Sequence, residues 1–251
     1  MTKTQYLALM SAALLAGCNT GGTTGDSLVN QDVAMVAAEG AAQNIEAMRG
    51  PGGMHGFGLP ALRGKFECDG GERHGLTVTR TCIYKDAAGT AQAAFNDLTT
   101  ASVAVHVEVK GTLGREGMSG TIDRTSDLLV TGLAGTETKM TWNGSGSGTS
   151  KRVRTRDGAT IQYDMTETGA TKDVVIPVPR TETSWPLSGT ITHKVTVKFT
   201  GGDKDGTTET RDVKITFDGT QYATVVVNGE TFQFDLAHRG RPGKGDQHPH
   251  P

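Results

Sequence analysis

Apolar and polar residues alternate along most of the second half of the chain. Residues 103–109 read Val-Ala-Val-His-Val-Glu-Val, and the same period of two returns in 191–199 and 213–217. This alternation is typical of strands with one buried face. Asp218-Gly219 and Asn228-Gly229 lie near or between such segments, and these dipeptides favour tight hairpin turns. The pattern predicts an antiparallel meander with one apolar face.

A different period occurs nearer the N-terminus. In residues 32–49 the apolar residues recur at steps of three and four, which predicts one amphipathic helix. Small and polar residues fill 18–31, as in a flexible tether. We therefore expect a tether over 18–31, a helix and glycine-rich linker over 32–66, and a β domain over 67–238. The tail, 239–251, has few hydrophobic residues and is expected to be disordered.

The β domain contains an internal repeat. Residues 118–132 and 187–201 both begin with Ser-Gly-Thr-Ile after one apolar residue and both end in Thr-Gly. Residues 157–165 align without a gap to 228–236, about 70 residues later. The alternative is chance similarity between two stretches rich in Thr and Val. We interpret the similarity as a duplication with units at about 118–165 and 187–236.

Two such units would each leave an apolar sheet face exposed unless they bury it together. The predicted fold class is therefore all-β, either a β-sandwich or one strongly curved sheet or barrel, plus the N-terminal helix. Residues 68–113 are expected to add two or three strands. The segment 174–186 contains three prolines and is expected to be an extended edge or a crossover.

The first 18 residues form a targeting pattern. Lys3 precedes ten mostly apolar residues, 6–15, which are too few to span a bilayer as a helix. Leu15-Ala16-Gly17-Cys18 follows and resembles the lipobox of bacterial lipoproteins. The alternative is a buried N-terminal helix with a chance cysteine. The resemblance implies that a signal peptide, 1–17, is removed and that Cys18 carries the lipid.

By the same resemblance, the chain is exported and held by lipid in the outer membrane or cell envelope, facing the periplasm or the cell surface. Asn19 stands where Asp would favour inner-membrane retention in enteric bacteria. The rest of the chain resembles exported lipoproteins of environmental bacteria, which implies no particular activity. With Cys18 lipidated, Cys68 and Cys82 are expected to form a disulfide, because disulfides persist in exported proteins. The alternative is a metal site made of both thiols and His74.

Composition and motifs exclude several classes of function. The net charge is −2 and the sequence pI is about 6.4, which disfavours an electrostatic nucleic-acid binder. Signatures of a nucleophile elbow, a zinc peptidase, a P-loop and a CxxC site are absent from the sequence. The sequence therefore predicts no enzyme, no cofactor and no metal site.

Two sets of residues are candidate ligand-binding sites. Arg124 and His193 occupy equivalent positions in the two repeat units, and each interrupts an apolar alternation, so they could line a ligand cavity. The alternative places them near strand ends. Arg152, Arg154 and Arg156 share one face of a basic strand and could meet an anionic group. The alternative is a solvated edge strand protected by its charge.

These patterns favour a membrane-anchored lipoprotein that binds an apolar or amphiphilic ligand without catalysis. The alternative is a structural or assembly component of the cell envelope that acts through contacts with other proteins. The expected partners are the membrane, through the lipid anchor, and either a small amphiphilic ligand or an envelope protein. A nucleic acid is not expected. The sequence 201–206 with Glu209 is similar to a fragment of a calcium loop, but it is more consistent with a hairpin turn.

Overall fold

The described residues of the protein fold into a single antiparallel sheet of 11 strands. A computed structural model describes residues 29–30, 33–34, 68, 70–73, 75–115, 118–156, 159–178 and 184–236. The strands are β1 (Gly71–Arg73), β2 (Leu76–Asp86), β3 (Ala91–Gln92), β4 (Thr100–Arg115), β5 (Met118–Thr131), β6 (Lys139–Arg156), β7 (Ala159–Pro177), β8 (Ser188–Thr200), β9 (Thr208–Thr216), β10 (Tyr222–Val227) and β11 (Glu230–Asp235). The all-β prediction is confirmed.

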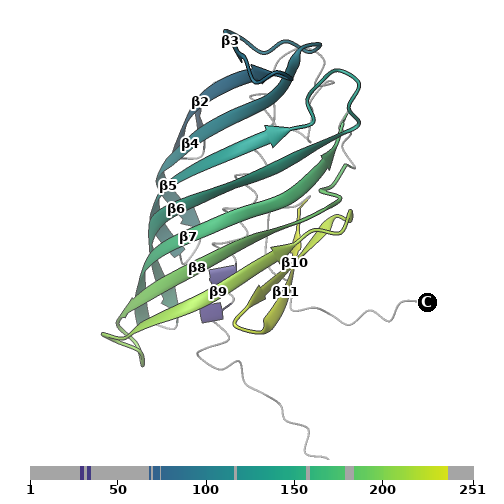
Figure 1. The fold of residues 1–251 in the computed structure, drawn as a ribbon. Helices are drawn as coiled ribbons and strands as arrows, with labels where there is room; N and C mark the ends of the chain where they lie inside the picture. Colours follow the sequence, from purple (N-terminus) through teal and green to yellow (C-terminus); the bar gives the residue numbers. More distant parts are fainter. Residues whose placement is uncertain are drawn as a thin grey trace, which may run out of the picture.

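The strands pair in chain order, as a meander does. The order is β1-β2-β4-β5-β6-β7-β8-β9-β10-β11, and β3 pairs with β2 beside this path. Figure 1 shows the long strands β4 to β8 running obliquely around a strongly curved sheet. Of the two predicted architectures, the curved sheet is therefore the one observed, and the sandwich is not. Within the described ranges no ladder joins β1 to β11, so the sheet is open.

The core lies on the concave, inner face of this sheet. Side chains on β4, β8 and β9 alternate between buried and accessible positions, as the sequence pattern predicts. The largest fully buried side chain is Trp142 on β6, and Phe199 on β8 follows it in size. The inner face is therefore an apolar surface built from nearly every strand.

The last hairpin has the turn that its sequence predicts. Asn228 and Gly229 connect β10 to β11 with φ angles of 47° and 87°. Both angles lie in the left-handed region, which two-residue type I′ turns require and which Asn and Gly tolerate best. The Asn228 side chain also accepts a hydrogen bond from the backbone N–H of Asp212, at 3.0 Å, which ties the turn to β9.

The predicted disulfide is present. Cys68 and Cys82 are bonded, with their Cα atoms 5.9 Å apart. Cys82 lies on β2 and packs against the core, so the bond fixes the chain before β1 to the middle of β2. A metal site that needs both thiols is thereby excluded.

The described part of the N-terminal region is helical and buried. Residues 29–30 and 33–34 are helical, and Val29, Val33 and Ala34 belong to the core cluster. Asn30 donates a hydrogen bond to the Glu230 carboxylate on β11, at 3.1 Å. Residues 29–30 thus differ from the flexible tether expected there. Within the described residues, no helix has the length and apolar character needed to cross a membrane.

One further segment differs from its prediction. Residues 174–177, expected to be part of an edge or crossover, form the end of β7 and pair with β6, with Val174 and Ile176 fully buried. The prolines suggested an edge or crossover, but Pro177 is the last residue of β7, where a missing N–H is tolerated. Most of the predicted helix 32–49, the leader 1–17 and the tail 239–251 lie outside the described residues.

Candidate functional site

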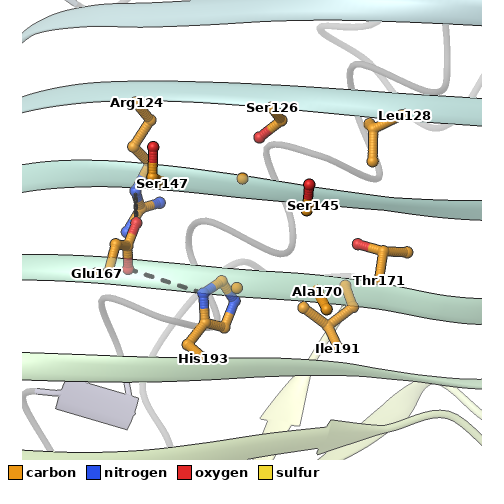
Figure 2. A pocket seen from close by; sticks show the side chains of 12 residues that line it. Arg124, Ser126, Leu128, Ser145, Ser147, Glu167, Ala170, Thr171, Ile191 and His193 are labelled. Carbon is orange, nitrogen blue, oxygen red and sulfur yellow. Dashed lines mark ion pairs between the residues drawn. The ribbon is translucent and has the colours of Figure 1, made fainter.

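Three ionisable side chains meet on the inner face of the sheet. Arg124 comes from β5, Glu167 from β7 and His193 from β8, and Figure 2 shows them pointing toward one another. Arg124 Nε forms an ion pair with Glu167 Oε1, and the three side chains are only 9%, 8% and 9% exposed. Arg124 and His193 lie in mid-strand, not near strand ends. We call these three residues the inner charge cluster.

A glycine allows Arg124 to reach Glu167 across the strand between them. Arg124 is the register partner of Gly148 on β6, and Gly148 is the register partner of Glu167. A Cβ at Gly148 would lie 2.5 Å from Cγ of Arg124, closer than two carbon atoms can approach. The ion pair therefore depends on the absence of a side chain at this position.

A small, partly enclosed cavity lies beside the inner charge cluster. Glycines take the inward position on two successive strands, because Gly146 on β6 pairs with Gly169 on β7, and Gly169 pairs with His193. The cavity leaves about 20 Å³ for the centre of a water-sized group. That space is enough for about one water molecule or one functional group. Its inward-facing side chains include Arg124, Ser126, Leu128, Glu167, Thr171, Ile191 and His193.

Two polar atoms of the cluster have no hydrogen-bond partner. Within the described ranges, Glu167 Oε2 and His193 Nε2 are buried and make no hydrogen bond. His193 Nδ1 lies 3.9 Å from Glu167 Oε2, which is too long for a direct hydrogen bond. An unsatisfied buried polar atom costs free energy, so a group that filled the gap would be stabilised there.

Burial lowers the pKa of His193 below its ordinary value of 6.5. Loss of hydration is the largest cause, the Glu167 carboxylate opposes it, and Arg124 adds to it. The imidazole is therefore neutral at neutral pH. A neutral imidazole carries one N–H donor and one nitrogen acceptor, so His193 can take part in hydrogen bonds of both kinds.

The basic strand predicted at Arg152, Arg154 and Arg156 is part of β6. This strand pairs with both β5 and β7, so the alternative of a solvated edge strand is wrong. Arg152 is buried and Arg154 is partly buried, and Arg156 is the last residue of β6, opposite Ala159. Arg152 pairs with Tyr163, four positions before Glu167 on β7. The register therefore places Arg152 and Arg154 four and six positions along β6 from Gly148, which lies between Arg124 and Glu167.

A second polar group lies at the end of β8 and the start of β9. Lys204 Nζ contacts both Glu209 oxygens, at 2.9 and 3.1 Å, and Arg211 also pairs with Glu209. The hydrogen bond from Lys204 is the largest cause that lowers the pKa of Glu209. Residues 201–206 therefore form a hairpin turn whose nearby carboxylate is already neutralised, and not a calcium loop.

Among the described residues, no group of three or more His, Cys, Asp and Glu side chains is arranged so that it could hold a metal ion.

Sequence reasoning found two members of the inner charge cluster and missed the third. Glu167 interrupts the alternation Tyr163, Met165, Glu167, as Arg124 and His193 interrupt theirs. The sequence therefore marked Glu167 in the same way as the other two residues. Whether the three side chains come into contact, however, depends on the register of β6 between β5 and β7. The inward glycines were missed for another reason, because a Gly/Ser-rich stretch is more typical of loops.

Comparisons with known proteins give no further guide. No protein-family model, no curated protein sequence and no solved structure matches this chain. The function must therefore be inferred from the inner face of the sheet and from the N-terminal sequence.

Proposed function

We propose that this protein is a lipid-anchored binding protein that holds a small amphiphilic ligand on the inner face of its sheet, without catalysis. The polar group of the ligand lies in the cavity beside the inner charge cluster. The observation that supports this proposal is that Glu167 and His193 line this cavity, and that one buried polar atom of each, Oε2 and Nε2, makes no hydrogen bond.

Stability alone gives no reason for this arrangement. Moving an ion pair out of water costs several kcal/mol per ion, and replacing a buried pair with apolar residues is often neutral or stabilising. The core cluster on the inner face consists of aliphatic and aromatic residues, and two of them, Leu128 and Ile191, line the cavity beside the charges. A buried Arg, Glu and His beside empty space is therefore better explained by ligand binding.

The size and walls of the cavity limit the ligand. About 20 Å³ admits one polar functional group and no bulky headgroup. Leu128 and Ile191 border the same cavity and offer an apolar surface for the part of the ligand next to that group. These features together favour a small amphiphile with a compact polar end.

Native mass spectrometry of the full chain, produced in an exporting bacterial host, tests this proposal. We expect a stoichiometric adduct on the wild type and none on the double variant Arg124→Met/Glu167→Met. Because this variant removes both charges, we expect it to fold with similar or higher stability. Thr166→Ala, an exposed change on β7 next to Met165, should keep the adduct. A wild-type chain without an adduct, or a double variant that retains it, would contradict the proposal.

The anchor is tested separately. Lipidation of Cys18 should make the mature chain partition with membranes, because two or three acyl chains anchor firmly at about 0.8 kcal/mol per buried methylene. Cys18→Ala should release the chain from the membrane fraction and remove the lipid mass. If Cys18→Ala still partitions with membranes, the anchor proposal fails.

A second candidate is an assembly component of the envelope, and a groove on the outer face favours it. This groove, of about 670 Å³, crosses β7 to β10 and is bordered by the exposed residues Thr168, Thr192, Lys194 and Lys214. A photo-crosslinking residue at Thr192 should then capture one envelope protein in living cells, while the same residue at Thr166 should not. Equal labelling at both positions would reject this candidate.

A further inference from the structure

We propose that the group recognised in the cavity is a hydroxyl, so that the ligand class is a neutral hydroxylated amphiphile. This inference rests on the proposed function and specifies its ligand. It follows from which hydrogen-bond donors and acceptors face the cavity, and from the distance between them.

The gap between Glu167 and His193 has the size of one bridging oxygen. Glu167 Oε2 and His193 Nδ1 are 3.9 Å apart, too far for a direct hydrogen bond, and the cavity that these two residues line has room for one water-sized group. Figure 2 shows both side chains turned toward the same space. One oxygen of a water or a hydroxyl can bridge two polar atoms at this separation.

The chemistry of the two partners selects a group that both donates and accepts. Glu167 forms an ion pair with Arg124, and the oxygens of a carboxylate in an ion pair can only accept hydrogen bonds. The neutral imidazole of His193 offers one N–H. A hydroxyl can donate its hydrogen to Glu167 and accept the hydrogen of His193 at the same time. One oxygen thus bridges Glu167 Oε2 and His193 Nδ1.

Charged groups fit this site less well. An ionised carboxylate has only acceptors and would face the Glu167 carboxylate across the gap. An ammonium has only donors and would add an unbalanced positive charge beside Arg124, whose charge is already balanced by Glu167. Both groups would also lose their hydration in a cavity whose titratable side chains are about nine-tenths buried. The remaining wall, which includes Ser126 and Thr171, adds no net charge.

A competition between three probes of equal chain length tests the inference. Octan-1-ol, octanoate and octylammonium are added in equal amounts to the full chain held in lipid nanodiscs at neutral pH, and native mass spectrometry measures the bound fraction of each. We expect octan-1-ol to exceed each of the others by at least about tenfold, since a hydrogen bond to a charged group contributes a factor of that order.

His193→Leu should remove the preference for octan-1-ol by about tenfold, while Thr166→Ala should leave it unchanged. In the wild type, octan-1-ol should also shift the imidazole nitrogen resonances of His193, which a purely structural role would not do. Stronger binding of octanoate or octylammonium would overturn the hydroxyl inference and leave the proposed binding function in place. If none of the three probes binds above the level of empty nanodiscs, both proposals fail.

Discussion

At the scale of single residues, the site depends on where side chains are absent. Gly148 lies between Arg124 and Glu167, and Gly146 and Gly169 take the inward positions beside Ser126 and His193. A Cβ at Gly169 would lie 2.6 Å from Nδ1 of His193. These glycines therefore give the neighbouring side chains the room in which they meet.

Gly148→Ala tests this dependence. The added methyl group would overlap Arg124 Cγ, at 2.5 Å, and the backbone oxygen of Asp123, at 2.8 Å. We expect the free energy of unfolding, measured by urea denaturation, to fall by about 1–3 kcal/mol, the usual cost of overpacking. Ser147→Ala, an exposed change on the same strand, should stay within about 0.5 kcal/mol of the wild type. Equal stability of both variants would show that Arg124 does not need the space above Gly148.

Two histidines should give the stability opposite dependences on pH. Burial lowers the pKa of His193 in the folded state, so its contribution is full above pH 6.5 and is lost as the pH falls below this value. His106 is exposed on β4, and its hydrogen bond to Asp127, at 2.7 Å, is the largest cause that raises its pKa. Its contribution is full below pH 6.5 and is lost as the pH rises through the raised value.

Urea denaturation between about pH 5 and pH 8 measures both effects, which follow from proton linkage. His193→Gln should flatten the loss of stability on the acidic side. His106→Gln should flatten the smaller loss on the alkaline side, because a surface ion pair contributes only about 0.2–1 kcal/mol. If His193→Gln leaves the acidic side unchanged, the histidine is not held neutral by burial.

At the scale of elements, alternation predicted the strands well where Val and Ile provided it. Residues 103–109 and 191–199 lie inside β4 and β8, and the Asn228-Gly229 turn connects two strands as expected. The alternation pattern did not predict the middle of β6, because residues 143–149 read Asn-Gly-Ser-Gly-Ser-Gly-Thr and lack apolar side chains. These residues form a strand because β5 and β7 pair with them on both sides, which a local pattern does not reveal.

The candidate site was predictable to the same limited extent. Arg124 and His193 stood out as polar residues on an apolar face, and both lie in the cluster. Arg152 also lies on the inner face, but its register places it opposite Tyr163 and away from Glu167. The period of two along a single strand determines which of its residues share a face. The register of several strands determines which residues of that face come into contact.

The contribution of the disulfide to stability can be tested at the scale of elements. The disulfide closes a loop with a sequence separation of 14, and the entropy of such a loop corresponds to about 3 kcal/mol. The double variant Cys68→Ala/Cys82→Ala should lose about this much stability, and hydrogen exchange should speed up first in β1 and β2. Unchanged exchange in these two strands would show that the bond is not what holds the N-terminal edge of the sheet.

At the scale of the whole molecule, the inner face draws on both ends of the described chain. Val33 is 2% exposed and belongs to the same core as β4 to β11, and Asn30 bonds to Glu230, 200 residues away. The helical residues near the N-terminus are thus part of the folded body. The apolar interior of the sheet is covered partly by a segment that precedes every strand.

Val33→Ala tests this role. Removing two buried methyl groups should lower the free energy of unfolding by about 1–2 kcal/mol, at roughly 0.8 kcal/mol for each carbon. Urea denaturation of the full chain measures the change, with Thr166→Ala as the exposed control. If Val33→Ala is as stable as the control, the helical segment contributes nothing to the core.

The chain order of the sheet also determines how the molecule can assemble. Because strands pair in the order in which they occur, each new strand finds its partner already present when the chain emerges N-terminus first. Contacts between sequence neighbours cost little loop entropy, so folding can proceed as a series of added hairpins. The same order applies in reverse under mechanical load. A force applied to the two edge strands, β1 and β11, would break the ladders between neighbouring strands one after another, and would not shear all the strands at the same time.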